Sequence, residues 1–331
     1  MKIFAVVGAF LLVSACGGTP ASTGAADATA DVAAADVSGE VAGTDATQAE
    51  TQGETQGDTT TLPAVATDTV GGARPAAVAV PDAWTPDKKW PLILVLHGYS
   101  ASGLVQSAFL GIAARTNDFG YVAIAPDGTL DSSGNLFWNA TAACCDFGHI
   151  GVDDVTYLTG LIDEAIAKLA VDPKRVYVVG HSNGGFMAYR LACEKSDKIA
   201  AIAVIAGAVD PDFNACVAPK PVSVLHIHGT KDTSVLYGGE GSGKTGYPSA
   251  EGSIGQWTKR DGCGGTTSEL GTSDFDAVVD GSETTRISYG GCPSGVVVEQ
   301  WKMVNSGHIP GFTDEFRDAL AGWLTARGKV E

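Results

Sequence analysis

Short runs rich in apolar residues recur along the chain from Ala76 onward. These runs occupy residues 76–80, 91–96, 121–125, 175–179, 199–206, 222–227 and 296–304. Strands that are buried on both faces of a sheet have this composition, and such sheets are parallel and covered by helices. Apolar residues at helical spacing predict a helix over 155–169, and further helices are expected over 183–195 and 313–327. This alternation predicts an α/β fold with a mostly parallel, doubly wound sheet, helices on both faces, and a ligand site at the carboxyl ends of the strands.

The first 15 residues carry one basic residue and then an apolar run from Ile3 to Val13. This pattern is typical of a bacterial secretion signal, and the run is too short to span a bilayer. The sequence Val13-Ser14-Ala15-Cys16 resembles a lipobox, in which Cys16 receives a lipid and becomes the mature N-terminus. A plain secretory signal, cleaved nearby, is the alternative. We therefore expect an exported protein, either lipid-anchored on the cell envelope (outer membrane or cell surface) or secreted if the lipid is not attached.

Residues 16–72 form a different region, which is rich in Ala, Thr and Gly and contains no aromatic residue. Such a segment cannot bury enough apolar surface to offset the entropy lost on ordering, so it is predicted to be a disordered tether. It carries nine acidic residues and no basic one, within a net charge of −17 for the whole chain. The domain predicted over 73–331 has 29 acidic and 20 basic residues, which argues against nucleic acid or anionic lipid surfaces as partners. Membrane contact is expected only through the lipid, and we expect a monomer.

The segment from Val178 to Met187 contains the motif G-x-S-x-G at Gly180, Ser182 and Gly184. An apolar strand precedes the motif and a helix is predicted after it, so Ser182 would stand on a sharp turn with its hydroxyl exposed above the sheet edge. The glycines fit because β-carbons there would collide with the neighbouring strand and helix. Glycine makes up 43 of the 331 residues, so a structural glycine-rich turn is the alternative. The strand–turn–helix context favours Ser182 as a catalytic nucleophile.

A serine nucleophile needs a base, and the base needs an orienting acid. His308 follows the last predicted strand, and Asp232 follows the strand that ends at residue 227. With Ser182 they give the chain order serine–acid–histidine of the α/β-hydrolase fold, and only His308, among six histidines, lies beyond a plausible acid. Capping of a turn is the alternative role for Asp232. We predict a catalytic triad of Ser182, Asp232 and His308.

Two backbone N–H groups are expected to bind the oxyanion that develops during acyl transfer. One belongs to Asn183, directly after the nucleophile, and the other to Tyr99, in the loop after an early strand. The Tyr99 side chain is also a candidate wall of the substrate site. Trp138, in a long loop over the same sheet edge, is either a second substrate-binding wall or a plug of the core. His97 is interpreted as a structural brace for the Tyr99 loop.

Six cysteines remain if Cys16 is lipidated, and an even number in an exported chain indicates disulfides. A bond between Cys263 and Cys292 would close the long excursion at residues 262–291. A bond between Cys193 and Cys216 would link the helix after Ser182 to the loop after the next strand. The remaining pair would be the adjacent Cys144 and Cys145, and other connectivities stay open. Because no cysteine or histidine cluster has metal-ligand spacing, we expect no metal and no cofactor.

Residues 238–245 match G-x-x-x-x-G-K-[ST], the sequence of a phosphate-binding P-loop. That chemistry requires a buried strand directly before the motif and a helix that begins at the lysine. Here a loop precedes the motif, and Gly246-Tyr247-Pro248 blocks a helix after it. We therefore expect a glycine-rich surface loop and no nucleotide partner.

Several motifs occur in one order along residues 74–327: His97-Gly98-Tyr99, Phe137-Trp138-Asn139, Cys144-Cys145-Asp146, Gly151-Val152-Asp153-Asp154-Val155, Gly180 to Gly185, and His226 to Asp232. In this combination the chain resembles the secreted polyhydroxybutyrate depolymerase and feruloyl-esterase group of α/β-hydrolases. The resemblance implies a serine esterase, a carboxylic ester hydrolase with Ser182, Asp232 and His308 as triad. The ester substrate, possibly polymeric, would be a hydroxyalkanoate oligomer or polyester, or a feruloyl or acetyl ester of a polysaccharide.

One position departs from the pattern of that group. Many members have a tryptophan two residues after the catalytic histidine, where this chain has Pro310. The departure leaves the role of the histidine intact and leaves the substrate class open. An acyltransferase on the same scaffold and a catalytically silent surface-binding lipoprotein are the alternatives to an esterase.

Overall fold

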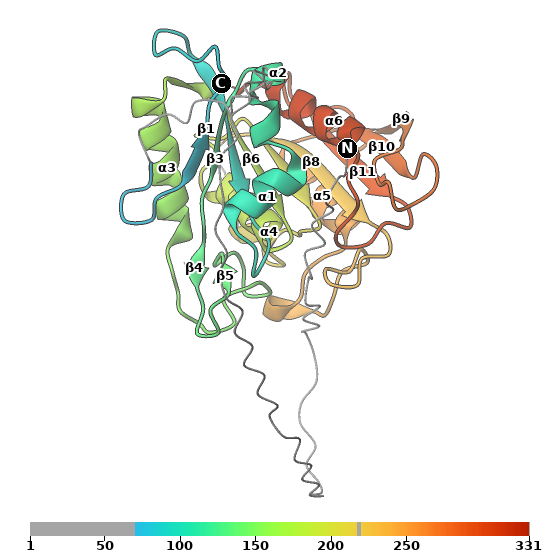
Figure 1. The fold of residues 1–331 in the computed structure, drawn as a ribbon. Coiled ribbons are helices and arrows are strands. Elements are labelled where there is room, and N and C mark those ends of the chain that lie inside the picture. The colour runs from blue at the N-terminus through green and yellow to red at the C-terminus, as the bar shows by residue number, and fades with distance from the viewer. Residues whose placement is uncertain (1–69, 217–219, 331) are drawn as a thin grey trace, which may run out of the picture. The chain divides into compact units, whose positions relative to one another are not determined.

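The computed structural model describes residues 70–216 and 220–330 (Figure 1). The predicted signal sequence, the lipidation site Cys16 and the predicted tether up to residue 69 lie outside the described residues. Throughout the described ranges, no helix is both long and apolar enough to cross a membrane.

The described chain begins three residues before the predicted domain boundary. Val70 is fully buried, and its backbone forms an isolated antiparallel bridge with Ala76. The N–H of Gly71 donates to a carboxylate oxygen of Glu164 at 2.7 Å. Residues 70–72, which the sequence analysis places in the tether, therefore already pack on the domain.

A nine-stranded sheet lies at the centre of the domain, in the order β1-β3-β2-β6-β7-β8-β11-β10-β9. Its strands are β1 (Ala77–Ala79), β2 (Trp90–Leu96), β3 (Val122–Ala125), β6 (Val171–His181), β7 (Ala201–Ile205), β8 (Ser223–Gly229), β9 (Thr267–Ser273), β10 (Thr284–Tyr289) and β11 (Val298–Met303). The consecutive strands from β3 to β11 in this order are parallel to one another. Each apolar run of the sequence corresponds to one strand, so the predicted mostly parallel sheet is confirmed.

Both edges of the sheet are antiparallel, which the sequence did not indicate. The strand β1 pairs antiparallel with β3, and β10 pairs antiparallel with both β11 and β9. All residues of β9 except the last are exposed, so this strand has no apolar pattern by which to recognise it. A separate hairpin joins β4 (Thr129–Leu130) to β5 (Leu136–Phe137).

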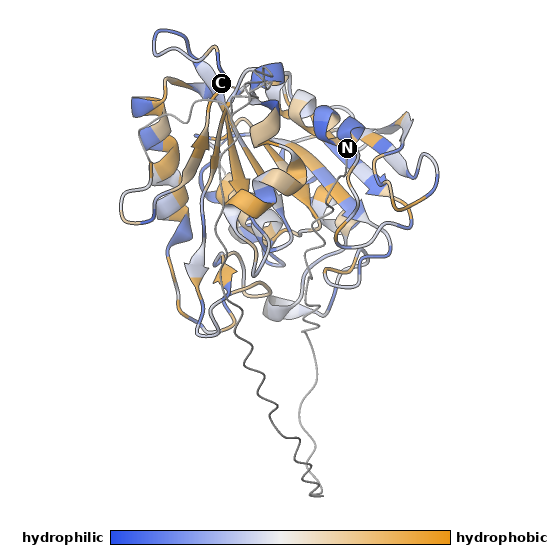
Figure 2. Ribbon diagram, in the orientation of Figure 1, coloured by the Kyte–Doolittle hydropathy of each residue, from blue (hydrophilic) through white to orange (hydrophobic). Residues whose placement is uncertain are grey.

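The helices form a layer on each face of the sheet (Figure 1). They are α1 (Gly103–Leu110), α2 (Thr116–Phe119), α3 (Asp154–Lys168), α4 (Asn183–Glu194), α5 (Ala250–Arg260) and α6 (Asp314–Thr325), with short 3₁₀ turns η1 (Ala113–Arg115), η2 (Phe213–Ala215) and η3 (Gly243–Thr245). Apolar residues of α3, α4 and α5 pack with Leu92 and Leu94 of β2, whereas those of α1 and α6 pack with Ile93 and Val95. Successive strand residues point to opposite faces, so one apolar run supplies two cores. Figure 2 shows the hydrophobic residues, in orange, concentrated in the central strands.

Polar side chains cap the starts of four of the helices. Ser102 accepts a hydrogen bond from the first turn of α1, Asp153 from that of α3, Ser249 from that of α5, and Thr313 from that of α6. Each bond satisfies an N–H group that the helix itself cannot pair. Helix α4 differs, because the residue before it, Ser182, makes no side-chain capping bond. Among the described residues, the first N–H groups of α4 therefore have no side-chain partner.

The P-loop-like stretch at residues 238–245 has the structure expected of a surface loop. Glu240 and Tyr247 form an isolated bridge across it, and a three-residue 3₁₀ turn, Gly243–Thr245, lies between them. The next α-helix begins only at Ala250. The strand–loop–helix arrangement that cradles phosphate is not formed by these residues, which confirms the reading as a loop.

Candidate active site

Ser182 lies at the turn between β6 and α4, at the carboxyl ends of the parallel strands. Its backbone angles, φ 55° and ψ −121°, fall in a region that residues with a side chain rarely adopt. Its N–H donates to the carbonyl of Ile205 at 2.8 Å, which fixes the turn to β7. A β-carbon at Gly180 would lie 2.0 Å from the carbonyl oxygen of Gly184, and one at Gly184 would lie 2.2 Å from that of Leu96. The predicted strand–turn–helix motif and its need for glycine are confirmed.

Asp232 and His308 meet at the same edge of the sheet. Asp232 follows β8 and His308 lies between β11 and α6, and Oδ2 of the carboxylate is 2.7 Å from Nδ1 of the imidazole. The other carboxylate oxygen, Oδ1, accepts the backbone N–H groups of Ser234 at 2.8 Å and Val235 at 2.9 Å. Asp232 therefore caps a turn and binds a histidine at once, and the cap fixes the direction of the carboxylate.

The environment of Asp232 keeps its carboxylate ionised. Burial on its own would raise the pKa of Asp232, but hydrogen bonds from His228 and His308 outweigh burial and hold the pKa well below its usual range. The proton in the contact with His308 therefore belongs to Nδ1 of the ring. In the neutral ring, Nε2 of His308 then has a free lone pair, as a general base requires.

His181, directly before Ser182, ties the loop of His308 to the turn. Its Nε2 is 2.8 Å from the backbone oxygen of His308, 127 residues away, and the two ring centroids are 4.9 Å apart. Because a carbonyl only accepts, Nε2 of His181 carries the proton. Burial, together with the nearby His308, lowers the pKa of His181 to about 3, so this ring is neutral. The sequence analysis missed this contact, for which the only signal is a histidine next to the candidate nucleophile.

Within the described part of the chain, the Ser182 hydroxyl makes no hydrogen bond to His308. Contacts of this kind are often long or poorly aligned before a substrate binds. The structure does show where the backbone of Ser182, Asp232 and His308 lies. The three residues follow β6, β8 and β11, whose carboxyl ends lie at one edge of the sheet.

The turn at Gly98 and Tyr99 approaches Ser182 closely. A β-carbon at Gly98 would lie 3.4 Å from the β-carbon of Ser182. The backbone N–H groups of Tyr99 and Asn183 donate to no group in residues 70–216 and 220–330. Asn183 is the first residue of α4, so the positive end of the helix dipole adds to its N–H. Both N–H groups that the sequence analysis names for an oxyanion site are thus unengaged.

Contacts at the hydroxyl and at the ring fix the position of the Tyr99 side chain. Its hydroxyl donates to Asp131 at 2.5 Å and accepts from the side-chain amide of Asn135 at 3.0 Å. Phe147, with 54% of its surface exposed, contacts the ring edge-on at a centroid distance of 5.5 Å. The half-buried Tyr99 ring is therefore a fixed wall next to the Gly98 turn.

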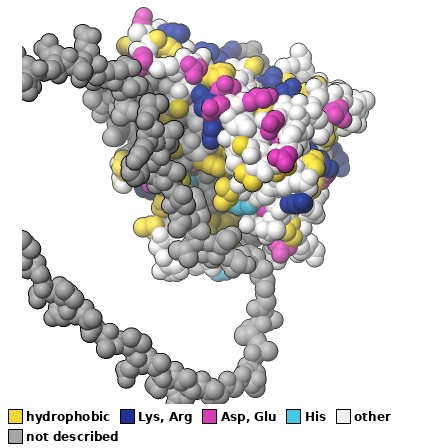
Figure 3. Space-filling view, turned by 45° about the vertical axis from the view of Figure 1, so that its right-hand side comes forward, with side chains coloured by type: hydrophobic (Ala, Val, Ile, Leu, Met, Phe, Trp, Pro, Cys, Tyr) yellow, Lys and Arg dark blue, Asp and Glu magenta, His cyan; other side chains and the backbone are white. Residues whose placement is uncertain are grey.

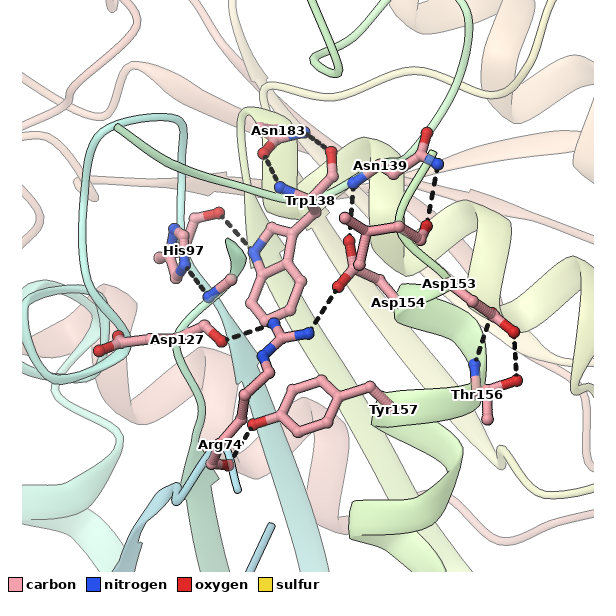
Figure 4. Close-up of polar contacts among 12 residues, drawn as sticks. Arg74, His97, Asp127, Trp138, Asn139, Asp153, Asp154, Thr156, Tyr157 and Asn183 are labelled. Atoms are coloured by element: carbon pink, nitrogen blue, oxygen red, sulfur yellow. Dashed lines mark hydrogen bonds and ion pairs between the residues drawn. The ribbon is translucent and has the colours of Figure 1, made fainter. Parts of the chain in front are cut away.

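Trp138 is a plug of the core and does not form a substrate-contacting wall. Its side chain is fully buried, and its indole N–H donates to the carbonyl of His97 at 3.1 Å. Its backbone N–H donates to Oδ1 of Asn183 at 2.7 Å, and its carbonyl accepts from Nδ2 of Asn183 at 2.9 Å (Figure 4). Of the two roles considered for Trp138, the structure shows the plug, because every polar atom of this residue is used inside the protein.

His97 braces the loop that carries Tyr99, as the sequence analysis proposed. Nε2 of His97 accepts the N–H of Gly128 at 2.8 Å, and Nδ1 lies 2.8 Å from the carbonyl oxygen of Gly98. Since a backbone N–H only donates, Nδ1 must carry the ring proton. Burial lowers the pKa of His97, so the neutral ring joins the two loops.

An ion pair between Arg74 and Asp154 lies next to the loop of Trp138 (Figure 4). The carboxylate of Asp154, at the start of α3, has no exposed surface and accepts from Arg74 at 3.2 Å and from the N–H of Asn139 at 2.8 Å. Arg74 also donates to the carbonyl of Asp127 at 2.9 Å, and its guanidinium lies 3.8 Å from the ring centre of Tyr157. These contacts join the first described segment, the long loop and α3.

The six cysteines of the domain are bonded in the pairs that the sequence analysis favoured: Cys263–Cys292, Cys193–Cys216 and Cys144–Cys145. The sulfur of Cys144 lies 3.5 Å from Nδ2 of Asn183, so the adjacent pair contacts the side chain that follows Ser182. Among the residues with described positions, no group of three or more His, Cys, Asp and Glu side chains could hold a metal ion.

Exposed apolar side chains occur in the same segments as the site residues: Leu104, Val105, Phe147, Ile150, Leu236 and Ile309. Figure 3 shows hydrophobic side chains interspersed with Lys, Arg, Asp and Glu on one face of the domain. The arrangement as a whole combines a serine on a strained turn, an ionised carboxylate bound to a histidine, and two free N–H groups. These are the components of nucleophilic acyl transfer.

Comparisons with known proteins find similar sequences and similar folds among esterases. Residues 91–220 match the family described as alpha/beta hydrolase fold. Feruloyl esterase B of Piromyces equi is 29% identical over 260 residues, which cover 76% of this chain and 44% of that protein. The bifunctional acetylxylan esterase/xylanase XynS20E of Neocallimastix patriciarum is 27% identical, over 78% of this chain and 35% of that protein. A poly(3-hydroxybutyrate) depolymerase of Ralstonia pickettii is 35% identical over 133 residues, 37% of this chain and 26% of that protein.

The chain thus spans less than half the length of each of these relatives. Among solved structures, the acetyl xylan esterase from Aspergillus awamori superposes with a TM-score of 0.53 at 16% identity, over 75% of this chain and 94% of that one. A thermostable esterase gives a TM-score of 0.50 at 15% identity, over 77% of this chain and 59% of that one. The sheet order, the Ser182 turn and these matches show that the domain has an α/β-hydrolase fold.

Proposed function

We propose that this chain is a serine esterase that hydrolyses carboxylic esters through an acyl-enzyme intermediate. The observation that carries the proposal is the hydrogen bond between Asp232 and His308, at the sheet edge where Ser182 stands on a strained turn. The names of the relatives, which include feruloyl esterase, acetylxylan esterase and poly(3-hydroxybutyrate) depolymerase, support the same class of reaction.

In the first half-reaction, Nε2 of His308 takes the proton of the Ser182 hydroxyl as Oγ attacks the ester carbonyl carbon. Asp232 holds the ring by its Nδ1–H bond and stabilises the imidazolium that forms. The negative charge that develops on the carbonyl oxygen is bound by the N–H groups of Tyr99 and Asn183. His308 then gives its proton to the departing alkoxide, which leaves as an alcohol while the acyl group stays on Oγ.

In the second half-reaction, water takes the place of the alcohol. His308 removes a proton from the water as its oxygen attacks the acyl carbon, and the same two N–H groups bind the second oxyanion. Collapse of this intermediate breaks the bond to Oγ, and His308 returns a proton to Ser182. The products are a carboxylic acid and the free enzyme, and no cofactor takes part.

The surroundings of Ser182 favour a bulky or polymeric ester. Between β7 and Asp232, where lids often reside, the described residues form only η2 and β8. The exposed apolar side chains Phe147, Leu236 and Ile309 offer contacts outside the scissile bond. Suitable substrates are hydroxyalkanoate oligomers or polyester, and feruloyl or acetyl esters of polysaccharides.

We further propose that the enzyme works outside the cytoplasm, held to the cell envelope by a lipid on Cys16 and by the segment 16–69. The sequence of residues 1–16 supports this location. The three disulfides of the domain also fit an oxidising compartment. Contact with the membrane would be made through the lipid, and a monomer suffices for all the residues of the proposed site.

A covalent probe tests the proposed nucleophile directly. A fluorophosphonate reacts with a serine only when a neighbouring base and oxyanion site activate it. We expect mass spectrometry of the labelled full-length chain to find the probe on Ser182, and we expect His308→Ala to prevent labelling. Absence of the probe from Ser182 in the folded wild-type chain would contradict the proposal.

A further inference from the structure

A buried line of polar contacts leads from Asp232 away from the proposed site. The oxygen that binds His308, Oδ2 of Asp232, also lies 3.3 Å from Nε2 of His228. Nδ1 of His228 is 3.4 Å from Nε2 of His226, and Nδ1 of His226 is 2.9 Å from the hydroxyl of Tyr189. The four residues of this line each expose 4% of their surface or less: Asp232, His228, His226 and Tyr189. The mechanism above uses Asp232 and His308 but not the other three.

The backbone carbonyl of Val235 determines which nitrogen of His228 carries a proton. Nε2 of His228 is 2.8 Å from the backbone oxygen of Val235, which can only accept, so Nε2 carries the proton. When the His228 ring carries this single proton, Nδ1 is an acceptor, and the N–H that faces it belongs to Nε2 of His226. Nδ1 of His226 in turn accepts the hydroxyl proton of Tyr189. The other tautomer of His226 would set two lone pairs against each other across 3.4 Å.

The sheet explains why these side chains line up. His226 and His228 are two residues apart on β8, so both point to the same face, while Ile227 points to the other. Tyr189 stands on α4, the helix that begins directly after Ser182. Burial, with the nearby His228, holds the pKa of His226 well below its usual range, which keeps this ring neutral. Every ring nitrogen of the pair has a partner, as a buried polar network requires.

We infer that His228 is a positioning residue for the Asp232 carboxylate, and that His226 and Tyr189 support the tautomer, set by the Val235 carbonyl, in which Nε2 of His228 carries the proton that faces Asp232. The inference rests on the proposed function, in which Asp232 orients His308. Oδ2 accepts from His308 at 2.7 Å and shares the Nε2–H of His228, at 3.3 Å, with the nearer Val235 carbonyl at 2.8 Å. Oδ1 accepts two backbone N–H groups, and these contacts together leave the carboxylate a single orientation. His228 therefore controls how strongly Asp232 accepts the ring proton of His308.

Two amide variants of His228 separate this role from a merely structural one. In His228→Gln the amide nitrogen can take the place of Nε2 and still donate to Asp232. In His228→Asn the amide oxygen can take the place of Nδ1 and accept from His226, but the side chain is too short to reach Asp232. Both variants replace the imidazole of His228 by an amide. They differ in whether the side chain at position 228 still donates to the Asp232 carboxylate.

The first readout is the proton NMR signal of the ring N–H of His308 in the full-length chain. In His228→Asn we expect this signal to move downfield, because Oδ2 of Asp232 then accepts one proton instead of two. In His228→Gln we expect it to stay near the wild-type position. Circular dichroism of the same samples establishes that both variants are folded. An unchanged signal in folded His228→Asn would overturn the inference, and this readout does not depend on ester turnover.

The second readout is ester hydrolysis. We expect His228→Asn to lower kcat about tenfold, the effect of one lost hydrogen bond to a charged group, with KM within about twofold of wild type. We expect His228→Gln to retain most of the activity. Equal losses of kcat in the two folded variants would contradict a role through Asp232. If the NMR signal moves as expected but the wild-type chain hydrolyses no ester, the proposed function fails and the positioning of Asp232 by His228 stands.

Discussion

Oδ2 of Asp232 lies 2.7 Å from Nδ1 of His308, although 76 residues separate the two in sequence. The contact is directional, because Oδ1 of Asp232 is already occupied by the N–H groups of Ser234 and Val235. The carboxylate therefore presents one particular oxygen to the imidazole. The proposed chemistry at Ser182 depends on this arrangement, since it decides which nitrogen of His308 carries the proton.

Replacement of Asp232 by Asn tests that dependence. The amide oxygen must remain on the side of the two backbone N–H groups, so the NH₂ group faces Nδ1 of His308 and donates to it. The ring proton then moves to Nε2, where it blocks the removal of the Ser182 proton. We expect Asp232→Asn to lower kcat about 10⁴-fold, with the fold intact.

The matched control for this variant is Asp280→Asn, which makes the same change at an exposed position. Steady-state kinetics on a nitrophenyl ester should show wild-type kcat for the control. A loss of less than about tenfold in Asp232→Asn would mean that this carboxylate does not set the tautomer of His308.

The order of Ser182, Asp232 and His308 could be predicted from the sequence for a physical reason. Parallel strands place their carboxyl ends at one edge, so polar residues that follow apolar runs are brought together whatever their separation in the chain. The same reasoning predicted that the Tyr99 loop lies beside Ser182. Such a prediction needs only the positions of the strands, which the apolar runs indicate.

The role of Trp138 could not be predicted in this way. An apolar ring in a loop has the same pattern whether it faces solvent or the core, and its burial depends on partners from other segments, His97 and Asn183. The hydrogen bond between Tyr189 and His226 joins a helix to a strand 37 residues away and leaves no periodic signal. The exposed strand β9 was missed because it has no buried face.

Buried neutral histidines should make the stability of the domain depend on pH. The pKa of His181 is lowered to about 3, and that of His226 is also lowered, from an ordinary value of 6.5 in the unfolded chain. The unfolded state therefore binds more protons below pH 6.5, so the stability present above this pH is lost as the pH falls toward 3. We expect each of the two to lower the free energy of unfolding by about 1.4 kcal/mol per pH unit in that window.

Urea denaturation at several pH values between 4 and 7 measures this slope. His181→Gln removes one titrating group, so its slope should be smaller than that of wild type by about 1.4 kcal/mol per pH unit. Ser268→Ala changes an exposed residue that does not titrate and should leave the slope unchanged. Equal slopes in His181→Gln and wild type would contradict the assignment of a buried neutral ring.

The ion pair between Arg74 and Asp154 should matter for stability. The Asp154 carboxylate has no exposed surface, whereas 30% of the Arg74 side chain is exposed, so Arg74→Met would leave a buried charge without its cation. We expect the free energy of unfolding to fall by about 3 kcal/mol, the low end for a broken buried pair because Arg74 is partly solvated.

Adding Asp154→Asn to Arg74→Met supplies the control. A neutral amide costs less to bury than an unpaired carboxylate, so the double variant should regain part of the lost stability in urea denaturation. If the double variant is less stable than Arg74→Met by the full effect of Asp154→Asn alone, the two side chains act independently and the pairing contributes nothing.

The disulfides should differ in their contribution to stability. The bond between Cys263 and Cys292 closes a loop of sequence separation 29, whereas that between Cys144 and Cys145 spans adjacent residues. Replacing both Cys263 and Cys292 by Ala should lower the free energy of unfolding by about 3–4 kcal/mol, because the unfolded chain gains the entropy of the open loop. The double alanine variant of Cys144 and Cys145 should lose much less by this mechanism. Similar losses in urea denaturation for the two variants would contradict the loop-entropy account.

The most direct test of the central claim is ester hydrolysis by the wild-type chain and by Ser182→Ala, with Ser268→Ala on the exposed strand β9 as the matched control. With a nitrophenyl ester as substrate, we expect the wild type and Ser268→Ala to have the same kcat. In Ser182→Ala, folded by circular dichroism, kcat should fall by about 10⁴-fold or more. Hydrolysis by Ser182→Ala within about tenfold of wild type, or none by either chain, would contradict Ser182 as the nucleophile of an esterase.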